Sequence, residues 1–228
     1  MVPAAPPTAT ERAYRWTKGA ILSGDLAGGT LISEGDVAQQ ADVSRTPVRE
    51  AFLRLQSEGL LTLFPKRGAL VVAVTPQEVA DVIGARQLVE PWAFERAATS
   101  ADVERIADEL DACIRRQDEC IKNEDQAGFQ EADRAFHEVA VTETGNGLLA
   151  AFYSALRDRQ LRMPALTALG GAEREERSLS EHSAIADAVR RGDAAEAAAL
   201  VRQHVATAGA VLGLAAEAAE GNGEAPTA

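Results

Sequence analysis

The chain has 228 residues, a formal net charge of −12 at pH 7, and 46% hydrophobic but only 4% aromatic residues. This length can supply a sizeable core, and we expect two small domains in series. No run of about 18 apolar residues is present to span a membrane, and the first ten residues lack the basic start and apolar core of a signal peptide. We therefore expect a cytoplasmic protein without a membrane partner. Apolar residues recur mostly at three- and four-residue spacing, which predicts a mostly α-helical fold.

The acidic charge is distributed unevenly along the chain. Residues 1–74 carry eight Lys and Arg against seven Asp and Glu, a net charge of +1, whereas the remainder carries −13. Binding to phosphates depends on the field within about a Debye length, roughly 8 Å at physiological salt. An acidic second domain therefore does not exclude nucleic-acid binding by the first.

The first 60 residues contain three predicted helices. An apolar stripe predicts a helix over 11–23, and Ser33, followed by Asp36, is typical of the start of a short second helix. After the turn "ADV", Ser44 is the expected N-cap of a third helix that runs to about residue 57, with a proline in its first turn, where the missing N–H costs nothing. The inner face of the third helix carries Val48, Phe52 and Leu55.

The outer face of this third helix carries Arg45, Thr46 and Arg49 near its N-terminus. A recognition helix touches base edges and phosphates from these positions, although two arginines alone would more often form a solvated face. The residues that follow this helix favour its interpretation as a recognition helix over a solvated face. Two short strands, 60–64 and 69–74, are joined by the basic turn 65–68, and three helices followed by such a hairpin make a winged helix-turn-helix.

The segments "SRTPVREAFLRLQSEGLL" and "PKRGALV" closely resemble the DNA-binding domain of the GntR family of bacterial transcription regulators. The resemblance covers roughly residues 11–74. One departure is Gly35, where many members have an arginine, so the operator is expected to differ from the family's usual one. The resemblance implies that the DNA contacts are Ser44, Arg45, Thr46, Arg49, Lys66, Arg67 and Gly68.

The sequence from residue 75 predicts an all-α bundle of about six or seven helices. Thr75 to Glu78 forms a capping box with proline at the first helical position, which marks the start of a new domain, 75–217. The tails 1–10 and 218–228 are expected to be disordered. A loop around 164–171 breaks the helical pattern, and the expected helices are 76–98 with a bend near Pro91, 102–122, 125–143, 146–162, 174–191 and 194–217.

The three histidines of the chain lie on predicted inward faces. Asp133 and His137 are four residues apart, one helical turn on one face. His182 and His204 lie ten and twelve residues from the turn at Gly192, so two antiparallel helices would hold them at nearly the same level. A single buried histidine is usually a satisfied core residue, but three with an aspartate can hold a divalent metal. Zinc is the first choice, and nickel, cobalt and manganese also suit these ligands.

The motifs "DRAFHEVAVTETGN", "EHSAIADAVRRGD", "RQH" and "RQLVEPWAFERAA" extend the resemblance to the ligand-sensing (FCD) domain of the FadR-type branch of the family. It implies that an Asp and three His bind a metal, here Asp133, His137, His182 and His204. It also implies that Arg86 and Asn146 enter an effector cavity. From the residues alone, Arg86 could form a surface ion pair with Glu90, and Asn146 could cap the helix that follows it.

These features predict a homodimeric transcription regulator, a repressor rather than an enzyme, that binds double-stranded operator DNA. We expect a small organic acid bound beside the metal to change the affinity for DNA. Two alternatives stay open. One is a metalloenzyme with an attached DNA-binding-like domain, although "HEVAV" lacks the second histidine of an H-E-x-x-H site. The other is a direct metal sensor, with the metal itself as effector.

Overall fold

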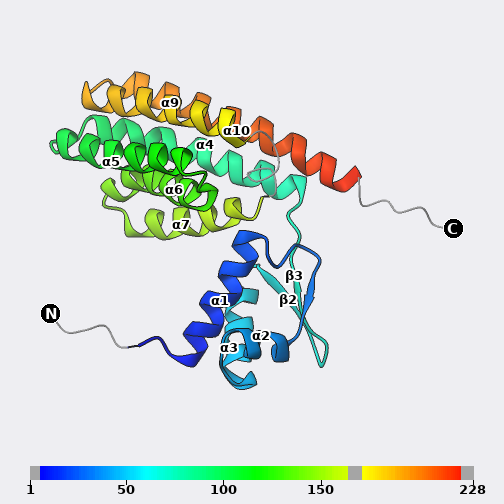
Figure 1. The fold of residues 1–228 in the computed structure, drawn as a ribbon. Coiled ribbons are helices and arrows are strands. Elements are labelled where there is room, and N and C mark those ends of the chain that lie inside the picture. The colour runs from blue at the N-terminus through cyan, green and yellow to red at the C-terminus, as the bar shows by residue number, and fades with distance from the viewer. Residues whose placement is uncertain (1–5, 164–170, 222–228) are drawn as a thin grey trace. The chain divides into compact units, whose positions relative to one another are not determined.

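A computed structural model describes residues 6–163 and 171–221, and the chain divides into two compact units, Met1–Val74 and Thr75–Ala228 (Figure 1). In the described part of the chain, no helix is both long and apolar enough to cross a membrane.

The first unit is a winged helix-turn-helix, as the sequence predicts. A three-stranded antiparallel sheet has the order β1-β3-β2, so the hairpin of β2 and β3 forms the wing. Strand β1 was not predicted, because two residues are too short to carry a periodic pattern. The elements are α1 (Ala9–Ser23), β1 (Leu31–Ile32), α2 (Glu34–Gln40), α3 (Arg45–Ser57), β2 (Leu61–Phe64) and β3 (Gly68–Val71).

Side-chain caps determine where the helices begin. Helix α1 starts at Ala9, two residues before the predicted start, because the Thr8 hydroxyl accepts a hydrogen bond from the backbone N–H of Glu11. The expected disordered tail over 1–10 is therefore wrong at its last residues, while residues 1–5 lie outside the described part. Ser33 caps α2 in the same way, as expected.

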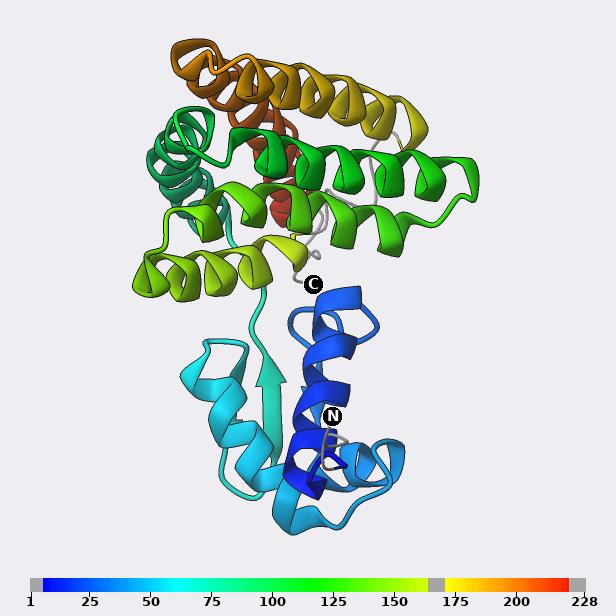
Figure 2. The ribbon, with the colours of Figure 1, turned by 90° about the vertical axis from the view of Figure 1, so that its left-hand side faces the viewer.

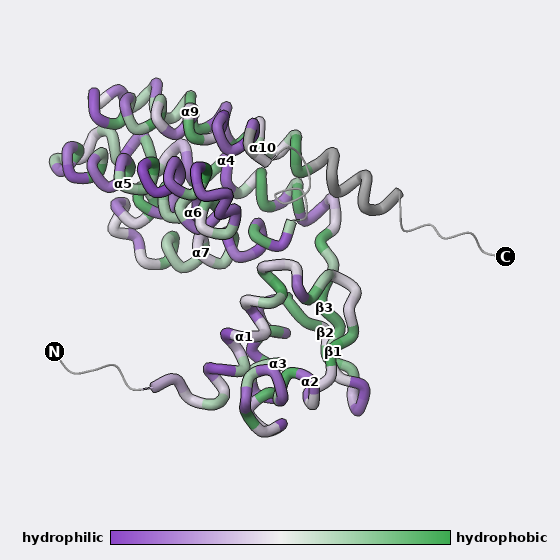
Figure 3. Tube along the Cα trace, viewed as in Figure 1, coloured by the Kyte–Doolittle hydropathy of each residue, from purple (hydrophilic) through white to green (hydrophobic). Residues whose placement is uncertain are grey.

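The core of the first unit lies between its three helices and the hairpin. Val48, Phe52 and Leu55 of α3 are buried, as their spacing predicts. They join apolar residues of α1, α2 and the strands in one cluster, and Figure 3 shows hydrophobic residues along β2 and β3. This packing leaves the opposite face of α3 exposed to solvent.

Gly68, at the end of the wing turn, is required by the backbone. Its φ is 101°, and a Cβ built there would lie 2.1 Å from the carbonyl oxygen of Ile32 in β1. Gly68→Ala is therefore expected to lower the free energy of unfolding by roughly 1–3 kcal/mol, because it adds backbone strain and a clash. Urea unfolding of both proteins checks this, with Gly19→Ala, whose Cβ meets nothing within 4 Å, as control. Equal stability of the Gly68→Ala and wild-type proteins would contradict it.

The second unit is an all-α bundle with six helices in its described part. Helix α5 contacts α6 and α9, α6 contacts α7, and α4 packs along α10 (Figure 2). Helix α4 starts where predicted, because Thr75 accepts a hydrogen bond from Glu78 N–H and Pro76 occupies the first turn. The bounds are α4 (Pro76–Ala98), α5 (Val103–Lys122), α6 (Gln126–Glu143), α7 (Gly147–Leu161), α9 (Gly171–Arg190) and α10 (Ala194–Gly221).

The last helix is longer than the sequence predicts. Helix α10 continues to Gly221, so the expected disordered tail over 218–228 begins too early. The sequence of this part alternates alanine and glutamate, two strong helix formers, and contains no proline before residue 221. Residues 222–228 lie outside the described residues, as does the predicted break at 164–171 except for Gly171, which is the first residue of α9.

Candidate nucleic-acid interface and candidate metal centre

A groove of about 630 Å³ lies between the start of α2, the exposed face of α3 and the wing. The groove is bordered by most of the predicted DNA contacts: Arg45, Arg49, Lys66, Arg67 and Gly68. Thr46 is exposed in the first turn of α3, and Ser44 precedes this helix without a capping hydrogen bond from its hydroxyl. The structure therefore places all seven predicted contacts at or beside one groove.

Three of the four groove cations lack a hydrogen-bond or ion-pair partner among the described residues, whereas each of the other cations of this unit has one; Arg12, for example, donates to the backbone carbonyl of Asp42. Arg15, Lys18 and Arg54 form ion pairs with carboxylates of the unit. In contrast, no hydrogen bond or ion pair to Arg45, Lys66 or Arg67 is present among the described residues. The fourth groove cation, Arg49, donates from Nε to both carboxylate oxygens of Glu34, at 2.7 and 2.8 Å. Three exposed cations without carboxylate partners give this groove a local positive field despite the acidic total charge.

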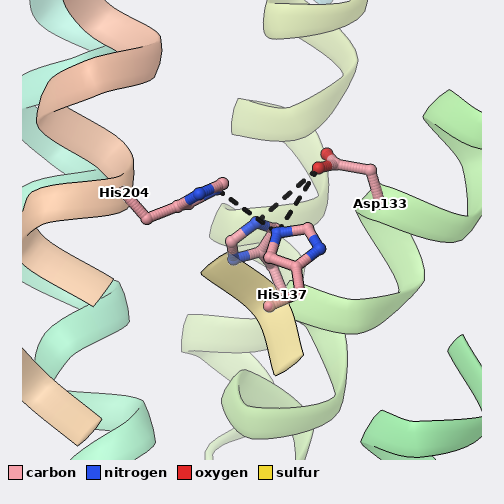
Figure 4. A group of neighbouring side chains, drawn as sticks. Asp133, His137 and His204 are labelled. Atoms are coloured by element: carbon pink, nitrogen blue, oxygen red, sulfur yellow. Dashed lines mark hydrogen bonds and ion pairs between the residues drawn. The ribbon is translucent and has the colours of Figure 1, made fainter. Parts of the chain in front are cut away.

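In the second unit, the four predicted metal ligands lie together. One ligand atom from each of Asp133, His137, His182 and His204 lies within 4.8 Å of all the others. Nε2 of His182 is 3.4 Å from Nε2 of His204 and 3.7 Å from Oδ1 of Asp133. Helices α6, α9 and α10 supply these residues, and Figure 4 shows Asp133, His137 and His204 pointing toward a common centre.

The outward nitrogen of each histidine faces an oxygen of a neighbouring side chain. Nδ1 of His182 lies 2.9 Å from the amide oxygen of Gln117, and Nδ1 of His204 lies 2.7 Å from the Glu181 carboxylate. Nδ1 of His137 lies 3.0 Å from Oε2 of Glu90. The oxygens of Gln117 and Glu181 accept hydrogen bonds, so they favour the Nδ1–H tautomers of His182 and His204 and leave the Nε2 lone pairs of these two rings facing each other, whereas Nδ1 of His137 has no hydrogen-bond partner among the described residues.

The protonation states also suit a cation. Burial lowers the pKa of His137 to about 4, against the opposing attraction of Glu90. Burial, together with the neighbouring His204, holds the pKa of His182 well below its ordinary value. Although burial alone would raise the pKa of Asp133, the guanidinium of Arg157 holds it below its ordinary value. Neutral His137 and His182 beside the ionised Asp133 are in the form that binds a metal.

The spacing of the four donors allows a metal to fit. With metal–ligand distances of about 2.1 Å, neighbouring ligands lie roughly 3.0–3.4 Å apart, so small side-chain shifts suffice. Arg157 engages Oδ2 of Asp133, which leaves Oδ1 toward the histidines. Nitrogen lone pairs this close, without a proton between them, repel one another unless a cation lies among them. The cluster could therefore hold a divalent metal, whose identity these donors do not select.

A cavity of about 80 Å³ lies beside the cluster. Arg86, Arg157 and His204 border one part of it. The apolar side chains in its lining are Phe129, Leu161, Ala208, Val211 and Leu212.

Arg86 lies at the edge of this cavity and not on the surface. Both Arg86 and Glu90 are buried, so the expectation of a surface ion pair is wrong. Arg86 donates to Glu90 from Nε at 2.5 Å, and its Nη2 lies 3.4 Å from Nε2 of His137. Although burial raises the pKa of Glu90, Arg86 and then His137 hold it well below the ordinary value. The pairing of Arg86 with Glu90 was predicted correctly from their four-residue spacing. This spacing does not show whether the pair is exposed or buried.

Asn146 lies outside the cavity in the described part of the chain. Its side chain is exposed and caps α7 by accepting hydrogen bonds from the N–H groups of Leu148 and Leu149. The structure shows the capping role, and the effector-binding role that the resemblance implies stays a prediction.

Several residues at both sites were not predicted from the sequence: Glu34, Gln117, Arg157 and Glu181. Glu181 precedes His182 directly, and that adjacency was the only signal available. The other contacts join residues from different helices, and a single sequence gives no pattern for them.

Comparison with known proteins identifies both units. The family model "Bacterial regulatory proteins, gntR family" matches residues 9–71, and the FCD domain model matches residues 81–207. A transcriptional regulator from an unstable DNA locus of Streptomyces ambofaciens is 31% identical over 81% of this chain and 77% of that protein. The galactonate operon transcriptional repressor of Escherichia coli is 30% identical over 77% of this chain and 84% of the repressor.

Other relatives and solved structures are also similar to this chain. The gluconate operon transcriptional repressor of Bacillus subtilis is 32% identical over 60% of this chain, which covers 56% of that protein. A GntR transcriptional regulator from Rhodococcus sp. RHA1 is 25% identical, with a TM-score of 0.75 over 89% of this chain and 96% of that chain. E. coli McbR/YncC shares the fold, with a TM-score of 0.75, 21% identity, and coverage of 93% and 98%. The chain belongs to the GntR family of bacterial regulatory proteins, in the group that carries an FCD domain.

Proposed function

We propose that this protein is a transcriptional repressor that binds operator DNA through the groove formed by α2, α3 and the wing. The observation that carries this proposal is the set of three groove cations, Arg45, Lys66 and Arg67, for which the described residues offer no carboxylate partner. A duplex would supply phosphates and guanine acceptors to them. The relatives named as repressors support the direction of control, and their names do not support the metalloenzyme alternative.

We further propose that Asp133, His137, His182 and His204 hold a divalent metal that helps to bind a small carboxylate effector. A metal in the cluster would supply a positive centre for an acid. The buried guanidinium of Arg157 borders the same cavity, and its Nε has no hydrogen-bond partner among the described residues. An acceptor that reaches this nitrogen would satisfy a buried donor, which favours an anionic ligand.

The cavity indicates a compact acid. Its volume of about 80 Å³ holds about five to eight waters at roughly 10–15 Å³ each. An acid with a similar number of non-hydrogen atoms would replace these waters. Gluconate and galactonate, which appear in the names of two relatives, are also carboxylates, but each has more non-hydrogen atoms than this volume accommodates.

One titration tests the whole proposal. Fluorescence anisotropy would measure binding of the full chain, loaded with zinc, to DNA from upstream of its own gene, with short carboxylic acids, gluconate and galactonate added in turn. We expect specific binding that one acid weakens. Specific binding that no acid changes, but that metal removal abolishes, would instead identify a direct metal sensor. No specific binding to any DNA would refute the repressor.

We propose that the second unit also forms a homodimer. Two pairs of large apolar side chains are exposed on α4 and α7, which contact each other. Leu88 and Leu148 are 80% and 86% exposed, and each is followed four residues later by an exposed aromatic, Trp92 or Phe152. A second copy of this chain would cover these side chains and provide the two-fold symmetry of an operator.

The double variant Leu88→Glu/Leu148→Glu is expected to be monomeric, because each interface would bury four additional carboxylates. Light scattering after gel filtration would show wild-type protein at twice the 24.1 kDa mass of one chain and the variant at the single mass. Leu53→Glu, which changes an exposed leucine in the first unit, is the matched control and should remain dimeric. A dimeric double variant would locate the interface elsewhere.

A further inference from the structure

Gly35, in the first turn of α2, lies against the guanidinium of Arg45. A Cβ built on Gly35 would lie 3.3 Å from Nη2 and 3.8 Å from Cζ of Arg45. The φ of Gly35 lies outside the left-handed region, so the helix would accept other residues at this position. The backbone therefore does not require glycine at position 35. The absence of a side chain there leaves room for the guanidinium of Arg45.

The position of Arg45 depends on this space, whereas that of Arg49 does not. Two hydrogen bonds to Glu34 orient Arg49. For Arg45, the described residues provide no such anchor, and the surface beside Gly35 is where its guanidinium lies. A side chain at position 35 would move the far end of Arg45, which is flexible, at little cost to the fold.

Both residues border the groove assigned to DNA. Arginine reads guanine through two parallel hydrogen bonds, so a small displacement of the guanidinium changes which acceptors it can meet. We propose that Gly35 determines operator specificity through Arg45: the absence of a side chain at position 35 allows the guanidinium to lie against α2 and fixes the base pair that it reads. This inference rests on the proposed function, because it requires DNA in this groove.

The test compares four full-length proteins: wild type, Gly35→Ala, Arg45→Ala and the double variant. In vitro selection would first define the preferred operator of the wild type, and anisotropy would then measure the affinity of each protein for single base-pair substitutions of it. We expect Gly35→Ala to weaken binding to the wild-type operator about tenfold, with a changed preference only at the base pairs that Arg45→Ala also affects. In the Arg45→Ala background, the change at Gly35 should have no further effect.

Gly19→Ala is the matched control, because it also adds a methyl group to a helix of this unit but meets nothing within 4 Å. It should bind as the wild type does. The proposal is overturned if Gly35→Ala keeps the wild-type preferences, or if its effect persists without Arg45, since Gly35 would then face the DNA directly. If the wild type selects no sequence at all, the proposed function itself fails.

Discussion

Alanine at Arg45 or Arg49 is expected to weaken specific operator binding strongly while the fold and the proposed dimer persist. Both side chains are exposed on the outer face of α3, and neither belongs to the core. A bidentate contact between arginine and guanine contributes about 1–3 kcal/mol, and a dimer on a two-fold operator loses it twice, about 2–6 kcal/mol. Anisotropy on operator and on scrambled DNA measures the loss, which should be at least about 30-fold on the operator and small on the scrambled sequence.

Two further variants separate base reading from general attraction. Lys66→Ala, at the wing tip, should weaken binding to operator and to scrambled DNA about equally and reduce the salt dependence of binding by about one charge per chain. Arg15→Ala removes a cation that is already paired with Glu11 on α1, outside the groove lining, and should change little. If both Arg45→Ala and Arg49→Ala keep the preference for operator over scrambled DNA, α3 is not the recognition helix.

The local pattern of the first unit made its fold predictable. Apolar spacing identified the buried side of α3, and the cap at Ser33 identified the start of α2, just as the cap at Thr75 identified the start of α4 in the second unit. Such signals act within a few residues, so a single sequence displays them. Contacts between separate helices and strands depend on how the chain packs in three dimensions, so a single sequence does not display them. The bond from Arg49 to Glu34 spans 15 residues, and the proximity of Gly35 to Arg45 depends on how α2 packs against α3.

In the candidate metal centre, too, the local spacing was predictable from the sequence and the contacts between helices were not. Helical period places Asp133 one turn from His137, and similar distances from the Gly192 turn, ten and twelve residues, place His182 nearly level with His204. The sequence analysis placed the two pairs in one site because buried histidines and a buried aspartate need polar partners, and a helical core offers few others. The partners of the outward nitrogens come from three other places in the chain: Glu90, Gln117 and Glu181. No periodicity relates these residues to the histidines, so only the structure identifies them.

Replacing His182 is expected to remove the metal. This side chain is fully buried, its Nε2 faces both Asp133 and His204, and its ring stacks on Phe136 with centroids 4.1 Å apart. His182→Ala eliminates one of four donors and leaves a void, so His182→Gln, which retains most of the volume, is measured beside it. Elemental analysis after dialysis against metal-free buffer should find about one zinc per wild-type chain and almost none in either variant.

A graded variant distinguishes loss of a ligand from general damage to the core. Gln117→Leu keeps all four donors but removes the acceptor of His182 Nδ1–H, at 2.9 Å. Loss of such a supporting contact weakens metal binding about 10- to 100-fold, so this variant should retain metal in excess zinc and lose it in competition with a chelator. Circular dichroism melting checks that each variant is folded. One bound zinc per chain in both folded His182 variants, with wild-type affinity in competition with a chelator, would show that the four side chains are not the metal site, because a metal held by them loses affinity when a donor is removed.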